Sequence, residues 1–159
     1  MQGMRLLGLW MIVALLSGCG GKSTPESWLE TYPTTGTLTI NGAPAKGAIV
    51  RLFPLEPQPN VTSPVIPTAT VREDGSFELM SYQTGDGAPE GGYAVTVEWP
   101  DPKLNASKGG MPEDPPDRLK GRFTNPERSK FKVQIVPGTN QLEAITLEKA
   151  EILKGSSLQ

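Results

Sequence analysis

Histidine is absent from the 159 residues of this chain, and cysteine occurs once, as Cys19. Without histidine the chain cannot form a Ser-His-Asp or Cys-His catalytic arrangement, and it lacks the commonest zinc ligand and the usual proton carrier near neutral pH. A lone cysteine cannot form a disulfide within the chain. We therefore expect a protein that is not an enzyme and that requires no metal or other cofactor.

Aromatic residues are also scarce, at 6% of the chain, whereas glycine and proline are plentiful, with 18 and 16 residues. This composition favours short strands joined by many turns over helices. The formal net charge is −2, whereas a nucleic-acid partner would require a strongly basic face. We therefore expect one β-rich domain that does not bind nucleic acid.

The N-terminal residues contain the three parts of a secretory signal. Arg5 supplies a positive charge, residues 6–16 are apolar, and small residues follow them. The apolar run is shorter than the ~20 residues that a transmembrane helix needs. The four residues that end at the cysteine, Leu16-Ser17-Gly18-Cys19, resemble a bacterial lipobox. At a lipobox, signal peptidase II cleaves the chain and a diacylglycerol is attached to the cysteine thiol.

The lipobox resemblance implies a signal peptide over residues 1–18, cleaved between Gly18 and Cys19, and acyl chains such as palmitate on Cys19. Each buried methylene contributes about 0.8 kcal/mol, and two or more chains give a stable membrane anchor. Gly20 stands where an aspartate retains many lipoproteins in the inner membrane. We therefore expect a lipid-anchored protein of the bacterial envelope (periplasm, outer membrane) that is attached to the outer membrane, and the sequence leaves the leaflet open. A cleaved signal that leaves a free thiol is the alternative.

The rest of the chain divides into three parts. Residues 19–33 are polar and predict a tether between the lipidated N-terminus and the fold. Residues 34–148 alternate between polar and apolar positions and predict the folded domain. Residues 149–159 are charged and then rich in glycine and serine, which is typical of a flexible tail.

Seven segments of the predicted domain have the period-two pattern of half-buried strands. Asn41-Gly42 and Asp74-Gly75 are strong hairpin-turn signals, and a further turn at residues 137–140 predicts a final hairpin. Strands of this number and length predict an all-β, seven-stranded antiparallel sandwich of Greek-key type, which is an immunoglobulin-like architecture. The seven segments are residues 35–40, 48–53, 68–71, 76–79, 93–99, 131–136 and 141–147.

The order of these motifs resembles the carboxypeptidase regulatory-like, or transthyretin-like, β-sandwich domains. Residues 36–50 are similar to the opening of that family, residues 70–77 to its "T-D-x-x-G-x-F" hairpin, and residues 87–97 to its "G-x-Y-x-V-t-V" strand. Arg72 departs from the family, which commonly has an acidic residue there. The resemblance implies a binding scaffold. The hydroxyisourate hydrolases of similar fold depend on histidines and a C-terminal Tyr-Arg-Gly-Ser, and both are missing here.

Acidic residues in the loops offer two kinds of site. A carboxylate pair for glycoside hydrolysis could come from Asp86 and Glu90, or from Glu113, Asp114 and Asp117. Calcium prefers oxygen ligands, and the candidate ligands are Glu73, Asp74 and Asp86. The simpler interpretation is that these are exposed loop acids, with Asp74 bonding to its own turn. We expect neither catalysis nor a metal.

Basic and aromatic residues provide two further candidates. Six basic residues could contact anionic lipid headgroups or acidic envelope glycans, and they are Arg118, Lys120, Arg122, Arg128, Lys130 and Lys132. The alternative is a solvated strand face whose lysines deter aggregation at a sheet edge. Tyr82, Tyr93 and Trp99 could form a platform for sugars, although alternation places Tyr93 and Trp99 in the core.

Together these patterns predict a membrane-anchored, non-enzymatic envelope lipoprotein whose β domain presents loops to a protein or glycan partner. A calcium-dependent or carbohydrate-binding adhesion module, acting through the acidic loops and residues 101–125, is the second hypothesis. A hydrolase is the third.

Overall fold

The computed structural model describes residues 28–101 and 115–153, and this part of the chain is all-β apart from one 3₁₀ turn. None of its helical segments is long and apolar enough to cross a membrane. The turn, η1, covers Pro126–Arg128. The strands are β1 (Thr31–Tyr32), β2 (Thr34–Ile40), β3 (Ala43–Pro44), β4 (Ile49–Pro54), β5 (Thr68–Thr70), β6 (Ser76–Glu78), β7 (Ala88–Pro89), β8 (Gly91–Glu98), β9 (Lys132–Ile135), β10 (Asn140–Gln141) and β11 (Ile145–Leu147).

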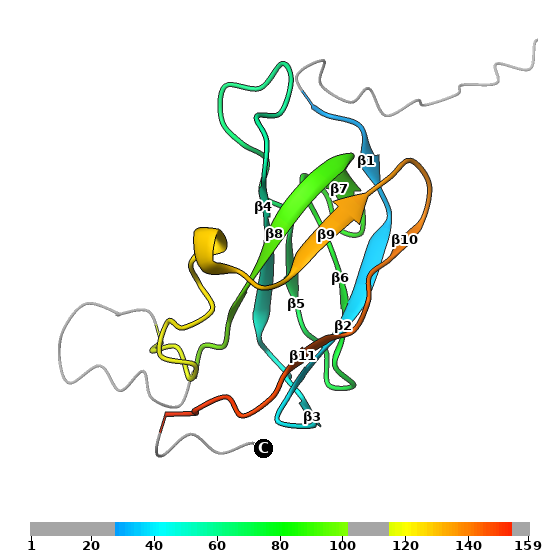
Figure 1. The fold of residues 1–159 in the computed structure, drawn as a ribbon. Coiled ribbons are helices and arrows are strands. Elements are labelled where there is room, and N and C mark those ends of the chain that lie inside the picture. Colours follow the sequence, from blue (N-terminus) through cyan, green and yellow to red (C-terminus); the bar gives the residue numbers. More distant parts are fainter. Residues whose placement is uncertain (1–27, 102–114, 154–159) are drawn as a thin grey trace, which may run out of the picture.

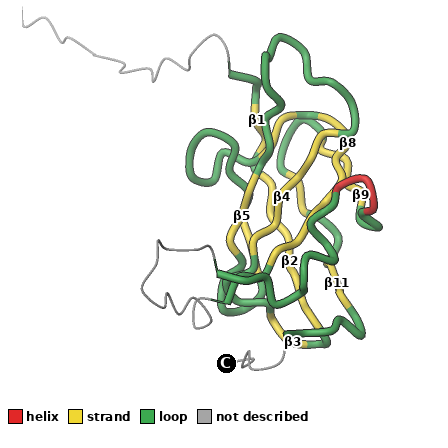
Figure 2. Tube along the Cα trace, turned by 90° about the vertical axis from the view of Figure 1, so that its left-hand side faces the viewer, coloured by secondary structure: helices red, strands yellow, loops and turns green. Residues whose placement is uncertain are grey.

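Two sheets face each other across a common core (Figures 1 and 2). One is antiparallel, with the order β5-β4-β8-β9. The other is centred on β2, which pairs with β10 and β11 along one side and with β3 and β6 along the other. A two-stranded ribbon, β1-β7, leads into both sheets, because β2 follows β1 and β8 follows β7 in the chain.

The two ends of this β-sandwich are fixed by strand register. At one end the last residue of β4, Pro54, pairs with Tyr93 near the start of β8, and Gly91 pairs with Ile135 at the end of β9. The β1-β7 ribbon lies at the same end, which we call the N-terminal end. The opposite end holds the pairs Ile49–Glu98 and Ile40–Leu147.

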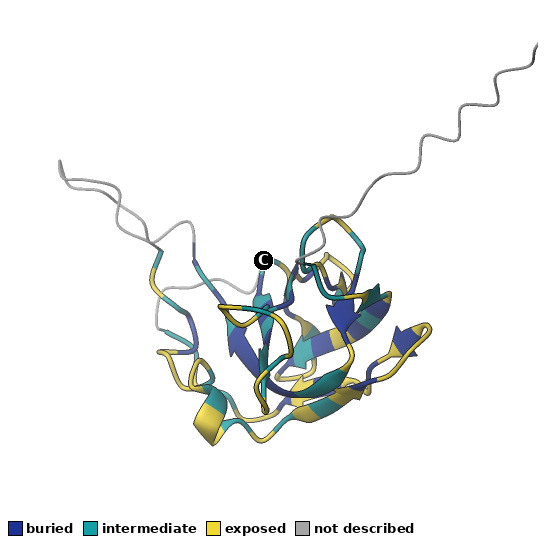
Figure 3. Ribbon diagram, turned by 90° about the horizontal axis from the view of Figure 1, so that it is seen from above, coloured by how far each residue is buried: buried dark blue, intermediate teal, exposed yellow. Residues whose placement is uncertain are grey.

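Each of the seven predicted segments contains a strand, and buried residues lie along these strands (Figure 3), including the alternating positions of the segment 93–99. Tyr93, Val95, Val97 and Trp99 each expose 3% or less of their surface. They meet Leu38 and Ile40 from β2 in one apolar cluster. Burying such side chains stabilises the fold by roughly 1.5–3 kcal/mol each. Period-two patterning therefore identified the residues of β8 that join the core cluster. Ala94 and Thr96 on the other face of β8 are buried as well.

The Asn41-Gly42 turn is confirmed as a hairpin. Both residues have positive φ, 52° and 80°, which suits the tight turn whose twist matches that of the flanking strands. Ile40 pairs with Ala43 across the turn. The Asn41 amide also bonds both backbone groups of Ala150, at 2.9 Å each, so this turn holds the C-terminal segment against the sandwich.

The Asp74-Gly75 turn forms the predicted hairpin only in part, because its two arms pair with each other at Thr68 and Met80 but not along β5 and β6. The turn closes locally, because the Arg72 amide donates to the Ser76 carbonyl at 2.8 Å. The strands on its two sides then enter different sheets, since β5 pairs with β4 and β6 pairs with β2. Phe77 lies against Gly36 of β2, where an added Cβ would be only 2.4 Å from its ring. Because Gly36 has no side chain, the Phe77 ring can pack against β2. This packing favours pairing of β6 with β2 over pairing of β6 with β5.

The expectation of purely antiparallel pairing is also corrected. β2 runs parallel to β10 and β11, with Thr34 opposite Asn140 and Leu38 opposite Ile145. The turn at residues 137–140 is therefore a crossing between sheets and not a hairpin. Its backbone is satisfied by one side chain, because the Asn140 amide accepts from the Val136 N–H at 3.0 Å and donates to the Val136 carbonyl at 2.9 Å.

The folded part extends beyond the predicted domain of residues 34–148 on both sides. Tyr32 pairs with Ala88 in the β1-β7 ribbon, within the segment predicted to be a tether. On the C-terminal side the Leu153 N–H donates to the Arg118 carbonyl at 2.8 Å, and Ile152 packs against the core. Backbone pairing thus incorporates residues 28–33 and 149–153, which composition alone assigned to the tether and the tail.

Candidate functional site

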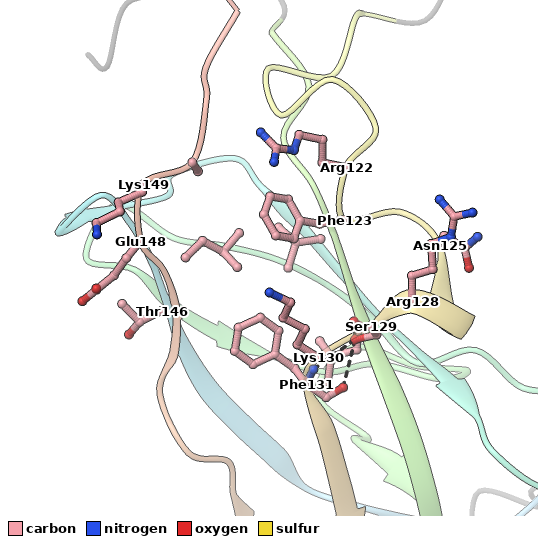
Figure 4. A pocket seen from close by; sticks show the side chains of 14 residues that line it. Arg122, Phe123, Asn125, Arg128, Ser129, Lys130, Phe131, Thr146, Glu148 and Lys149 are labelled. Atoms are coloured by element: carbon pink, nitrogen blue, oxygen red, sulfur yellow. Dashed lines mark hydrogen bonds between the residues drawn. The ribbon is translucent and has the colours of Figure 1, made fainter.

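A groove of about 340 Å³ opens between the two sheets, toward the end opposite β1 (Figure 4). Its floor is apolar and is made by Val95 and Val97 of β8 with Phe123, Phe131 and Leu147. Its rim is basic and comprises Arg122, Arg128, Lys130 and Lys149.

The groove exists because the chain bulges away from β8 just before β9. The Val95 N–H donates to the Phe131 carbonyl at 2.9 Å, and the Val97 N–H donates to the Phe123 carbonyl at 3.0 Å. Residues 124–130 therefore loop out between two nearby pairing points on β8. Because they leave β8 here, they do not close the gap between β8 and β11, and the core residues beneath line the groove.

Polar contacts hold the bulge in place. The Asn125 side chain caps the η1 turn by accepting from the Glu127 N–H at 2.9 Å, and proline begins the turn. The Ser129 hydroxyl lies within hydrogen-bonding distance of the Val95 and Phe131 carbonyl oxygens, and it accepts from the Phe131 N–H at 3.2 Å. The bulge is thus fixed to β8, and the basic residues that it carries have a defined position.

The basic side chains of the rim differ in their partners. Arg122 lies 3.5 Å from the Glu151 carboxylate. Arg128, Lys130 and Lys149 form no ion pair within the described part of the chain. The only acidic side chain among the described lining residues is Glu148. Lys130 reaches in beside the two phenylalanine rings, with Arg128 and Lys149 on opposite sides (Figure 4). Positive charge therefore lies within the groove at Lys130 and at its two outer edges at Arg128 and Lys149.

Only part of the predicted basic cluster belongs to this groove. Arg122, Arg128 and Lys130 line it, whereas Lys120 pairs with Glu151 at 3.4 Å and Lys132 points away on the exposed side of β9. Lys149 was missed because it falls in the predicted tail. Phe123 was missed because it lies outside the alternating segments. Its position between the basic residues of the predicted cluster could have identified it.

Arg118 is a structural residue, and its assignment to an anion-binding surface is wrong. It exposes 7% of its surface, and its Nε lies 3.3 Å from the Asp101 carboxylate. Its guanidinium carbon stands 4.7 Å from the centre of the Trp99 ring. An arginine placed between a buried carboxylate and an aromatic face is well stabilised. It joins β8 to the segment before the groove.

The predicted carboxylate pairs have structural roles where the structure describes them. Asp117 accepts backbone hydrogen bonds from Trp99, Leu119 and Gly121 at 2.8–3.0 Å. Asp86 accepts them from Ser81, Tyr82 and Gln83 at 2.7–3.0 Å. Glu90 is exposed beside β8, and Glu113 and Asp114 lie outside the described residues. Carboxylates that fix turns in this way are not arranged as an acid and base pair.

The predicted calcium ligands are not brought together. Glu73 pairs with Lys46, and the neighbouring ammonium lowers the pKa of the Glu73 carboxyl. The Ser76 hydroxyl and amide both donate to Asp74 and lower the pKa of that carboxyl. Within residues 28–101 and 115–153 no group of three or more acidic, histidine or cysteine side chains could hold a metal ion.

The predicted sugar platform is wrong for two of its three members. Tyr93 and Trp99 are buried in the core. The Tyr93 hydroxyl donates to the Pro89 carbonyl at 2.9 Å, and burial raises the pKa of that phenol. The third member, Tyr82, stacks on Trp28 with ring centres 4.4 Å apart and planes 5° from parallel. Trp28 was missed as a partner because it was assigned to the tether.

Comparison with known proteins adds little to this geometry. No protein-family model matches the chain, and the search of curated proteins found no match either. A solved structure, the 9R-lipoxygenase from Cyanothece PCC8801, aligns with a TM-score of 0.41 and 14% identity. The alignment covers 84% of this chain and 20% of the lipoxygenase chain. At that score the likeness carries no inference about fold family or activity.

Proposed function

We propose that this protein is a bacterial envelope lipoprotein whose β domain binds an acidic glycan in the basic groove. The observation that carries the proposal is the placement of Lys130 beside Phe123 and Phe131, with Arg128 and Lys149 at the two edges of the same groove. Uronic-acid carboxylates suit arginine and lysine, and the apolar faces of sugar rings suit aromatic side chains. The activity is binding and not catalysis, because Asp86 and Asp117 are bonded to turns.

We further propose that the fold is a seven-stranded Greek-key sandwich of the transthyretin-like kind. Support comes from the seven strands of three or more residues, which are β2, β4, β5, β6, β8, β9 and β11. They fall on the segments whose order resembles that family. Domains of this kind act as scaffolds that present loops, which agrees with a site built by the bulge before β9.

A glycan titration tests the groove. Polygalacturonate, which carries a carboxylate on every sugar, is expected to bind the full-length protein, whereas neutral dextran is not. Replacing Lys130 and Arg128 together by alanine removes two charged contacts, so we expect the Kd to rise by roughly tenfold or more. Affinity should also fall as salt rises, because these cations are near the surface.

Lys132→Ala is the matched control for this titration. Lys132 is an exposed lysine of the same region, but it does not line the groove. Its loss should change the Kd by less than about twofold, which is typical of a peripheral charge. If K130A/R128A and K132A weaken binding equally, the interaction is a diffuse charge effect and the groove is not the site.

The membrane anchor has its own test. Cys19 lies outside the described residues, so its assignment depends on the lipobox resemblance. Cys19→Ser is expected to abolish incorporation of radiolabelled palmitate in bacterial cells, because serine lacks the thiol that is acylated. Intact-mass measurement of the native protein should show residues 1–18 removed and acyl chains added. Undiminished labelling of the serine variant would remove the anchor from the proposed function.

A further inference from the structure

We infer that the N-terminal end of the sandwich rests on the membrane surface, with Trp28 and Tyr82 at the level of the lipid headgroups. The inference depends on the proposed lipid anchor at Cys19 and adds an orientation to it. The partner is a zwitterionic bilayer surface. The basic groove then faces away from the membrane, toward envelope material at a distance from it.

Exposed apolar side chains gather at this end of the molecule. Leu55 follows the last residue of β4 and donates its N–H to the Gly92 carbonyl at 2.9 Å. Val136 follows the last residue of β9. Leu55 and Val136 expose 49% and 50% of their surfaces. A hollow of about 640 Å³ begins beside Leu55, is lined largely by prolines and other apolar residues, and extends from this end to Pro126 and Glu127 of η1. Exposing this apolar surface to water is unfavourable in free energy, and contact with a bilayer interface would remove part of that surface from water.

An aromatic pair completes the surface. Trp28 stacks on Tyr82, and the Tyr82 hydroxyl accepts from the Leu29 N–H at 3.0 Å. Both rings are only half-buried. Tryptophan and tyrosine are enriched at membrane–water interfaces, because one part of each side chain is apolar and the other is polar. The bond to Leu29 fixes the pair beside β1, where the chain enters the fold.

The chain length keeps this end near the anchor. Residues 19–27 connect the proposed lipidation site to Trp28. Nine residues span at most about 30 Å even when fully extended. The N-terminal end (Figure 1) is therefore the part of the sandwich that meets the bilayer first. Trp99 follows Glu98 at the opposite end, and the groove reaches Leu147 there.

The charges at the two ends differ. Glu30, Glu56 and Glu90 are exposed at the N-terminal end, whereas the basic rim lies toward the other end. Contact at the N-terminal end is therefore apolar and interfacial, and not an attraction to anionic lipid. Anionic lipid should weaken it, because these glutamates would be repelled. This dependence on lipid charge separates the proposed contact from binding through the basic residues.

The two tryptophans of the proposed mature chain make the contact measurable. The lipidated protein is purified from membranes and reconstituted into phosphatidylcholine vesicles that contain lipids brominated near the top of the acyl chain. Trp28 fluorescence should be strongly quenched. Trp99 is 3% exposed at the other end, so its emission should not change. Trp28→Phe preserves an aromatic partner for Tyr82 and should remove most of the quenching.

A second variant tests the apolar surface without touching either tryptophan. Leu55→Glu with Val136→Glu changes two exposed side chains, so the thermal midpoint should stay close to that of the native protein. Quenching of Trp28 should fall at least severalfold. Replacing part of the phosphatidylcholine by phosphatidylglycerol should lower the quenching in the native protein as well.

Sedimentation with the vesicles distinguishes failure of the proposed anchor from failure of the proposed orientation. If the protein does not sediment with the vesicles, the anchor and the proposed attachment to a membrane are wrong. If it sediments but Trp28 is not quenched, or if phosphatidylglycerol increases the quenching, the anchor stands and the proposed orientation is overturned.

Discussion

Replacing Gly87 by alanine is expected to destabilise the fold much more than the same change at Gly42. Both glycines have nearly the same backbone conformation, with φ of 83° and 80°. An alanine Cβ at Gly87 would lie 1.8 Å from the Tyr32 carbonyl oxygen and 2.8 Å from the Pro33 Cα, whereas nothing lies within 4 Å at Gly42. The φ strain common to both costs about 1–2 kcal/mol. The clash adds to it at Gly87 alone.

The clash at Gly87 involves backbone atoms, which cannot rotate away as a side chain can. Relief therefore requires β1 to separate from β7, with loss of the pairs Thr31–Pro89 and Tyr32–Ala88. We expect Gly87→Ala to lower the free energy of unfolding by about 3 kcal/mol or more, which is within the range of severe single substitutions. Chemical denaturation measures it, and Trp28 emission reports release of β1. Equal losses at Gly87 and Gly42, with unchanged Trp28 emission, would contradict the close approach.

Replacing Asp101 by alanine is the second change with a large expected effect. The Asp101 carboxylate exposes 1% of its surface and lies 3.3 Å from the Arg118 Nε, and the Arg118 side chain exposes 9%. Removal of one partner from a buried ion pair typically costs about 3–5 kcal/mol, because the remaining charge keeps its desolvation penalty. The free energy of unfolding should fall by that amount in a denaturant titration.

Two further variants separate this effect from simple truncation. In Asp101→Ala with Arg118→Met the buried charge is removed, while an unbranched apolar side chain still covers Trp99. The double variant should therefore be less destabilised than the sum of the two single changes. Arg72→Ala breaks the exposed pair with Glu78 and should cost about 0–1 kcal/mol. A strictly additive double variant would show that Asp101 and Arg118 do not act as a pair.

The two functional proposals place the binding site and the membrane contact at opposite ends of one domain. The basic groove lies beside Ile40 and Leu147, and the aromatic pair lies beside β1. A protein attached through its N-terminal end would hold the groove away from the bilayer, because the groove lining runs from Val95 in the middle of β8 to Leu147 at the opposite end. This arrangement selects between the two anionic ligands considered for the basic residues, because it favours acidic glycan over the headgroups of the anchoring membrane.

Local sequence patterns predicted the strands and turns, but they did not predict how all of the strands pair. Alternation located β8 and its buried face, and Asn41-Gly42 located a hairpin, because both depend on neighbours a few residues apart. Asp74-Gly75 and residues 137–140 have equally good turn chemistry, but each connects two sheets. A turn fixes the reversal of the chain. The partner of the next strand depends on distant packing, such as Phe77 against Gly36.

The sequence alone established that this protein is rich in β-strands and lacks histidine. It also located the strands, most of the turns and a lipobox-like segment near the N-terminus. The tertiary structure alone decided the parallel partners of β2, the burial of Arg118 beside Asp101, and the groove formed by β8, residues 122–131 and the segment after β11. Composition and period report each residue's own solvent preference. They do not show which distant residues pack against it and bury it. This long-range packing formed both candidate surfaces.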